Sequence, residues 1–181
     1  MLHNEFAIGD YVEFNGPTLG VTHEARVSMI TLVEALCTHK KYKIETLYLA
    51  MSLCDRYLVN LAILNQKAPS LVLLAVTGTL MSAKLEEPMQ PNFGRMVRLV
   101  QSQWSVTIEK SELFNLEEKI IKSLDFELHF SGPIPFLERY LRMYNLDLAS
   151  NDEEAFTISV LAHSFCQMVL KSPAYLSLKP S

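Results

Sequence analysis

Three long stretches of the chain contain neither glycine nor proline, and this spacing limits what the chain can fold into. They cover residues 21–68, 95–131 and 136–172. Glycine and proline most often interrupt regular structure, so uninterrupted runs of this length favour helices. With 181 residues, the chain is long enough to bury a core without a disulfide framework or a structural metal. We therefore expect an all-helical fold.

Charge and cysteine usage exclude several classes of protein. Sixteen basic residues against 20 acidic ones give a net charge of −4, which argues against a nucleic-acid-binding surface. Cys37, Cys54 and Cys166 are far apart and lie in apolar runs, as is typical of reduced core thiols in an intracellular protein. No signal-peptide pattern occurs at the N-terminus, and the longest apolar stretch is shorter than the roughly 20 residues that cross a bilayer. We expect a soluble protein.

Hydrophobic spacing predicts five helices in the first part of the chain. Apolar residues recur every three to four positions, which is typical of amphipathic helices. The third predicted helix is different, because it is apolar on every side and is therefore expected to be buried at the centre. The five helices are expected over residues 24–39, 44–61, 71 to the charged residues 84–87, 92–100 and 108–124. The glycine-containing residues 1–22 do not resemble a long helix, and we interpret them as an N-terminal extension.

The helical pattern starts again near Pro135, which suits the first turn of a helix. Asn151 and Glu154 resemble a capping pair that opens a further helix. Residues 179–181 repeat the pattern of residues 67–70, which precede the central helix of the first block. We therefore predict a partial repeat that stops where its central helix would start and whose apolar faces lean on the first block or on a partner. The expected division is an extension (1–22), a first block (23–131) and a partial second repeat (132–181).

Signatures of catalysis and metal binding are scarce. The chain has no glycine-rich phosphate loop, no Gly-x-Ser-x-Gly and no His-Glu-x-x-His. His163 and Cys166 have helical spacing, but a zinc site needs about four ligands and the sequence offers no second pair. We expect no enzyme, no cofactor and no metal.

One acidic residue stands out from the solvated charges. Glu117 lies beside the apolar stripe that contains Leu116 and Ile120. An acidic residue in that position is either a rim residue or a contact for something that docks there.

Several separated motifs, in the same order and spacing, resemble the cyclin box of the cell-cycle cyclins, nearest to the A and B types. They are residues 45–50, 55–58, 83–87 and 124–128. Residues 135–141 and 175–181 look like parts of the opening two helices of the C-terminal cyclin fold. The resemblance implies a five-helix cyclin box around a buried helix, followed by the first two helices of an incomplete second repeat.

The resemblance implies a regulatory subunit in cell-cycle control rather than an enzyme. Cyclins bind a cyclin-dependent serine/threonine kinase and dock on its mobile catalytic helix, which carries the glutamate that pairs with the ATP-positioning lysine. A cyclin that binds the active conformation more tightly shifts the kinase towards it. By the same resemblance we expect the protein in the nucleus and the cytoplasm, without nucleic-acid or membrane partners.

The family's paired lysine and glutamate fall on Lys84 and Glu117. In the family these residues hydrogen-bond main-chain groups beside the kinase helix, and such charge-assisted bonds are strong. The apolar kinase-binding neighbours at matching positions are Met81, Leu85, Ile121, Phe126 and Leu128. Taken without the resemblance, Phe126 and Leu128 are also compatible with plain core, and Lys84 with a solvated helix end.

Asp55 and Arg56 also match the family, and Asp55 is expected to form a structural ion pair with Arg26. Breaking a buried pair of this kind costs several kcal/mol.

The family's substrate-docking patch is degenerate in this chain. Its positions fall on Arg26, Met29 and Leu32, with Leu32 in place of a tryptophan. Ala35 replaces a glutamate and Val72 replaces a glutamine that would bind a basic substrate residue. We therefore expect only weak docking of Arg-x-Leu substrates or inhibitors.

Two other hypotheses stay open at this point. One is a cyclin-like transcription or scaffold protein, because related five-helix repeats occur in transcription factors; the acidic balance and the Lys84 and Glu117 combination count against it. The other is a decoy that occupies a kinase without activating it. The sequence names neither the kinase nor its substrates nor the cell-cycle phase.

Overall fold

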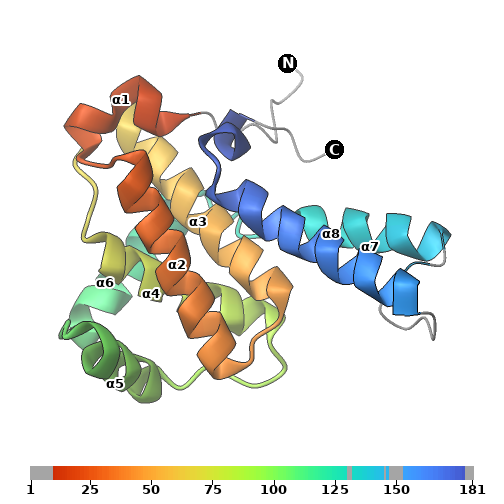
Figure 1. The fold of residues 1–181 in the computed structure, drawn as a ribbon. Coiled ribbons are helices and arrows are strands. Elements are labelled where there is room, and N and C mark those ends of the chain that lie inside the picture. The colour runs from red at the N-terminus through yellow and green to blue at the C-terminus, as the bar shows by residue number, and fades with distance from the viewer. Residues whose placement is uncertain (1–9, 130–131, 145, 147–152, 178–181) are drawn as a thin grey trace. The chain divides into compact units, whose positions relative to one another are not determined.

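The computed structural model describes residues 10–129, 132–144, 146 and 153–177, and all regular structure within them is helical (Figure 1). The expected all-helical fold class is thereby confirmed. The chain divides into two compact units: the first covers residues 11–130, and the second contains residues 131–181 together with residues 1–10. Each is described by itself.

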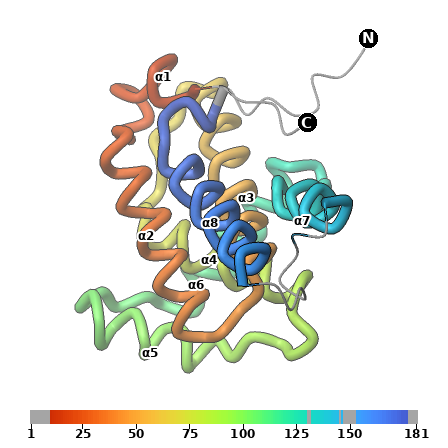
Figure 2. Tube along the Cα trace, turned by 45° about the vertical axis from the view of Figure 1, so that its right-hand side comes forward, coloured from red at the N-terminus to blue at the C-terminus, as the bar shows by residue number. Residues whose placement is uncertain are grey.

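The first unit is a bundle in which one helix is enclosed by the others (Figures 1 and 2). Its helices are α1 (Tyr11–Leu19), α2 (His23–Lys40), α3 (Ile44–Ile63), α4 (Leu71–Glu86), α5 (Phe93–Trp104) and α6 (Lys110–Ser123). Helix α4 packs against α2, α3 and α6, and every residue from 74 to 83 is buried. This confirms the prediction of five helices, α2 to α6, of which the third, α4, is buried at the centre.

Close packing of α3 against α4 depends on a single glycine. A Cβ atom at Gly78 would lie 2.6 Å from the sulfur of Cys54 and 3.2 Å from the carbonyl oxygen of Ala50. Real Cβ atoms essentially never come as close to another atom as 2.6 Å. The absent side chain therefore sets how closely the two helices approach.

Side-chain caps fix where several helices begin. The hydroxyl of Thr22 accepts a hydrogen bond from the backbone N–H of Ala25 at the start of α2, and the side-chain oxygen of Asn92 accepts one from the backbone N–H of Arg95 at the start of α5.

Helix α5 continues to Trp104, four residues beyond its predicted end at 100.

Helix α1 lies where the sequence analysis assigned only an extension. It has nine residues, contains Pro17 and is kinked at Asn15. The amide of Asn15 donates to the carbonyl oxygen of Ala62 on α3, at 2.7 Å. Packing against α3 therefore holds a helix whose own sequence, with a glycine and a proline inside it, favours helix poorly.

The second unit contains α7 (Pro133–Met143), α8 (Glu153–Lys171) and a short 3-10 helix, η1 (Pro173–Ser177). Helix α7 packs against α8, and α8 against η1. Helices α7 and α8 lie where two further helices are predicted, and their assignment to a second repeat stays a prediction. The proposed cap at Asn151 and the echo at residues 179–181 lie outside the described residues. Large apolar side chains are exposed on both helices, among them Tyr140, Met143, Leu161, Phe165 and Met168.

Candidate functional site

Lys84 and Glu117 form an ion pair that joins α4 to α6. The Nζ atom of Lys84 lies 2.6 Å from Oε1 and 2.8 Å from Oε2 of Glu117. Their side chains are 39% and 22% exposed, so the pair lies at the surface. An exposed ion pair contributes only about 0–1 kcal/mol to stability. The structure thus brings together the two residues that the resemblance pairs, in a place where the fold depends little on them.

The local sequence explains the position of the pair. Lys84 lies in the last turn of α4, where a positive charge interacts favourably with the helix dipole. Helix α4 is followed by Glu87, whose backbone is extended. The carboxylate of Glu87 accepts a hydrogen bond from the backbone N–H of Lys43, directly before α3. Helix α6 begins with a capping box formed by Glu109 and Glu112, which places Glu117 in the middle of the helix.

The other predicted contact residues lie on α4, on α6 and in the segment after α6. Leu85 is 52% exposed and Phe126 is 75% exposed, whereas Ile121 and Leu128 are half-buried. Met81 is buried and belongs to the core, so its predicted role as a contact residue is wrong. The name "α4–α6 surface" is used below for Lys84, Leu85, Glu117, Ile121, Phe126 and Leu128.

The backbone after α6 directs Phe126 into solvent. Asp125 and Phe126 have φ angles of 49° and 64°, in the left-handed region. The N–H of Phe126 donates to the carbonyl oxygen of Ile121 at 3.1 Å, which closes the end of the helix. A left-handed conformation costs a non-glycine residue on the order of 1–3 kcal/mol and is rare for a bulky one. Phe126 therefore combines a strained backbone with an exposed aromatic ring.

Arg56 holds the same turn from α3. Its Nη1 atom donates to the carbonyl oxygen of Glu127 at 2.8 Å. Burial lowers the pKa of this guanidinium, and the Glu127 carboxylate acts in the opposite direction. No sequence pattern gives Arg56 a role of its own, whereas in the structure this residue positions the turn after α6.

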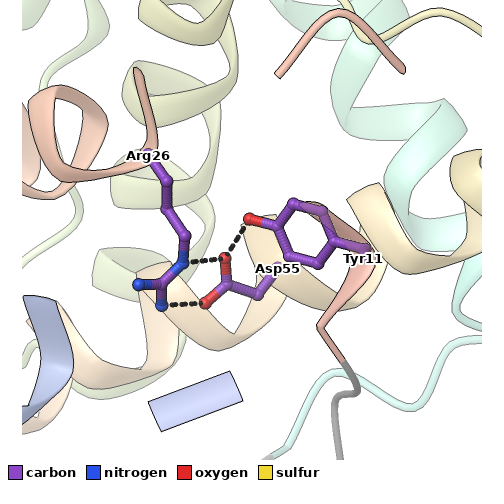
Figure 3. Close-up of polar contacts among 3 residues, drawn as sticks. All are labelled: Tyr11, Arg26 and Asp55. Atoms are coloured by element: carbon purple, nitrogen blue, oxygen red, sulfur yellow. Dashed lines mark hydrogen bonds and ion pairs between the residues drawn. The ribbon is translucent and has the colours of Figure 1, made fainter. Parts of the chain in front are cut away.

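A second polar cluster, formed by Tyr11, Arg26 and Asp55, lies in the interior (Figure 3). Nε and Nη2 of Arg26 donate to the two carboxylate oxygens of Asp55 at 3.0 and 2.7 Å. The hydroxyl of Tyr11 donates to Oδ1 of Asp55 at 2.7 Å. Burial, reinforced by the charge of Asp55, raises the pKa of Tyr11. The cluster ties α1, α2 and α3 together, and sequence reasoning missed Tyr11 because residues 1–22 show no helical pattern.

The degenerate docking patch requires a correction. Met29 and Leu32 are buried, and the guanidinium of Arg26 is bound to Asp55. None of these three side chains is on the surface, so they do not form a docking patch for a substrate. Their apolar and ionic contacts stabilise the interior instead.

Neither a metal site nor a membrane span is found in the part of the chain that the structure describes. No group of three or more potential metal ligands occurs among those residues. Nδ1 of His163 lies 2.8 Å from the carbonyl oxygen of Ser159, within its own helix. No helix in the same part is both long and apolar enough to span a membrane.

Comparison with known proteins agrees with this architecture. The family model described as "Cyclin, N-terminal domain" matches residues 5–129. The chain is 25% identical over 177 residues to the G2/mitotic-specific cyclin-B3 of Gallus gallus, which covers 98% of this chain and 40% of the relative. It is 29% identical over 137 residues to the G2/mitotic-specific cyclin-B3 of Mus musculus, a match that covers 76% of this chain and 9% of the relative. It is also 29% identical over 144 residues to Cyclin-A2-1 of Arabidopsis thaliana, a match that covers 78% of this chain and 30% of the relative. The chain therefore spans less than half the length of these relatives.

Proposed function

The chain belongs to the cyclin family, and from this premise we propose that it binds and activates a cyclin-dependent serine/threonine kinase through the α4–α6 surface. The names of the mitotic relatives support a role in cell-cycle control. For the protein we propose the locations expected of such a regulator, the nucleus and the cytoplasm.

The observation that carries the proposal is an exposed ion pair beside exposed apolar side chains. An ammonium group has three donors and a carboxylate accepts about four hydrogen bonds, so the contact between Lys84 and Glu117 leaves both with spare capacity. Together they offer donors and acceptors to the main-chain groups of a docked helix. Leu85 and Phe126 supply the apolar area around them.

Phe126 is the second feature that supports this surface as a binding site. Its ring is exposed, its backbone has a strained left-handed conformation, and Arg56 holds the neighbouring Glu127 in place. A partner that buries an aromatic ring of this size gains roughly 1.5–3 kcal/mol from the burial. The strained turn thus presents a preformed anchor, which lowers the ordering cost of docking.

The proposed mechanism requires no chemistry on this chain. The kinase transfers the phosphoryl group, and the α4–α6 surface binds the kinase conformation in which the catalytic helix is in place. The chain shifts the kinase towards that conformation only by the difference in its affinity for the two conformations. Tight binding without such a difference would occupy the kinase and leave it inactive.

The test is a kinase assay with purified components. The full chain is added to a mitotic cyclin-dependent kinase, and ATP-dependent phosphorylation of a basic protein substrate is measured. Activity is expected with the wild type and is expected to fall to the level of the kinase alone with Lys84→Ala/Glu117→Ala. The matched control is Glu118→Ala/Lys122→Ala, which removes another exposed ion pair from α6. In that pair Nζ of Lys122 lies 2.6 Å from Oε1 of Glu118.

The outcomes separate the hypotheses. The proposal is supported if the wild type and Glu118→Ala/Lys122→Ala activate the kinase and Lys84→Ala/Glu117→Ala does not. Binding without activation contradicts the proposed activating role and favours the decoy. Neither binding nor activation by the wild type contradicts the proposed function as a whole.

A further inference from the structure

The basic residues of the first unit are unevenly distributed. Residues 38–43 and residues 88–108 contain no aspartate or glutamate. They contain five basic residues, namely Lys40, Lys41, Lys43, Arg95 and Arg98. In a chain with a net charge of −4, these two segments form a local excess of positive charge.

The fold brings the two segments together. The C-terminal end of α2 lies beside the start of α5 in both views (Figures 1 and 2). Arg95 and Arg98 are one turn apart on α5 and both are exposed, because Met96 and Leu99 occupy its buried face. Lys40 is in the last turn of α2. The three cations therefore gather at one corner of the first unit.

The three charges lie close enough to repel one another, although the carboxylate of Glu87 lies near the end of α2 and is bound to the backbone N–H of Lys43. Burial lowers the pKa of Lys40, and the charges of Arg95 and Arg98 lower it further. Within the described part of the chain, none of the three side chains forms an ion pair. Lys40 alone is explained by its place at a helix C-terminus, where a cation is favourable. Arg95 and Arg98 have no such explanation.

We infer that Lys40, Arg95 and Arg98 form a binding surface for a phosphoserine- or phosphothreonine-containing segment of a partner protein. A phosphorylated side chain carries a charge of about −1.5 to −2 and three acceptor oxygens, which matches a small group of cations. Arginine guanidinium groups bind phosphate with two parallel hydrogen bonds, and two of them stand one turn apart here. The surface shares no residue with the α4–α6 surface.

A single phosphate group fits better than a polyanion. Nucleic acid carries a charge every few ångströms and needs an extended basic track, whereas the chain outside this corner is acidic overall. A phosphate on a flexible segment contacts the corner alone and avoids that repulsion. The charge pattern therefore favours a phosphorylated protein segment over DNA, RNA or an anionic membrane.

The experiment measures fluorescence anisotropy with the full wild-type chain and no kinase. The probe is a fluorescein-labelled peptide of glycine and alanine with one phosphoserine residue, and its unphosphorylated twin is the reference. The test variant is Arg95→Ala/Arg98→Ala. The matched control is Lys119→Ala/Lys122→Ala, which removes two exposed positive charges from α6. Circular dichroism verifies that all proteins have equal helix content.

We expect the wild type and the control variant to bind the phosphorylated peptide at least tenfold more tightly than its twin. The Arg95→Ala/Arg98→Ala variant is expected to lose this preference. Equal affinity for the two peptides, or an unchanged preference in that variant, would overturn the inference. Binding of duplex DNA or of phosphatidylserine vesicles at least as tightly as the phosphorylated peptide would overturn it as well. Because no kinase is present, these outcomes are independent of the proposed kinase contact.

Discussion

Replacement of Asp55 by asparagine is expected to destabilise the first unit strongly. The carboxylate of Asp55 is 0% exposed and its partner Arg26 is 1% exposed, so the substitution leaves a buried positive charge without a counter-charge. Breaking a buried ion pair by removing one partner costs about 3–5 kcal/mol. The total stability of a domain is about 5–15 kcal/mol, so the loss is a large part of it.

Tyr11→Phe provides the matched smaller perturbation. It removes one hydrogen bond to a charged acceptor, 2.7 Å long, and leaves the pair between Arg26 and Asp55 in place. Hydrogen bonds to charged groups contribute about 1.5–3 kcal/mol. The expected order of destabilisation is therefore Asp55→Asn above Tyr11→Phe.

The assay is equilibrium unfolding in urea at neutral pH, followed by the fluorescence of Trp104. This is the sole tryptophan of the chain and lies at the end of α5, so it reports on the first unit. The double variant Asp55→Asn/Tyr11→Phe is expected to lose less than the sum of the single losses, because both substitutions act on one network. A loss below about 1 kcal/mol for Asp55→Asn, the level of an exposed pair, would refute the buried-network account.

Three further predictions concern packing, the interface and pH. Gly78→Ala is expected to lower the free energy of unfolding by about 1–3 kcal/mol, because the new methyl group overpacks against Cys54. Calorimetry of this variant with and without Cys54→Ala checks the prediction. If Cys54→Ala recovers none of the lost stability, the clash with Cys54 is not the cause. Phe126→Gly places glycine at an exposed residue with a left-handed backbone, so we expect stability in urea to be unchanged or higher. Affinity for the kinase is expected to fall at least about tenfold. A loss of stability in this variant would mean that the Phe126 ring packs in the core. Burial raises the pKa of the Cys37 thiol from about 9 to about 12, so its contribution to stability is complete below pH 9 and is lost as the pH rises through 12. Unfolding measured between pH 9 and 10 is expected to depend less on pH in Cys37→Ala, and identical slopes would disprove the assignment.

The central helix could be predicted from the sequence because its signal is local. A helix that is apolar on all sides is buried wherever it packs, so α4 needed no knowledge of its neighbours. The ends of α4 were also predictable, because Lys84 and Glu87 mark the place where the chain returns to water. The contact of Lys84 with Glu117 came from the resemblance, since no local pattern connects residues on different helices.

The parts that the sequence did not predict depend on tertiary contacts. Helix α1 is held by α3 rather than by its own propensity, so neither the helix nor the role of Tyr11 had a local signal. The left-handed turn at Phe126 occurs at non-glycine residues, and sequence patterns therefore gave no sign that the ring is exposed. The burial of Met29 and Leu32 follows from the packing of α2 and was likewise not visible in the spacing alone.

The most direct test of the kinase-binding account is isothermal titration calorimetry of the full chain with a purified mitotic cyclin-dependent kinase. The wild type and Glu118→Ala/Lys122→Ala are expected to bind with the same affinity. Lys84→Ala/Glu117→Ala is expected to bind at least about 100-fold more weakly, because two charged hydrogen-bonding groups contribute about 1.5 kcal/mol or more each. Equal affinities for all three proteins would contradict the assignment of the α4–α6 surface as the kinase contact.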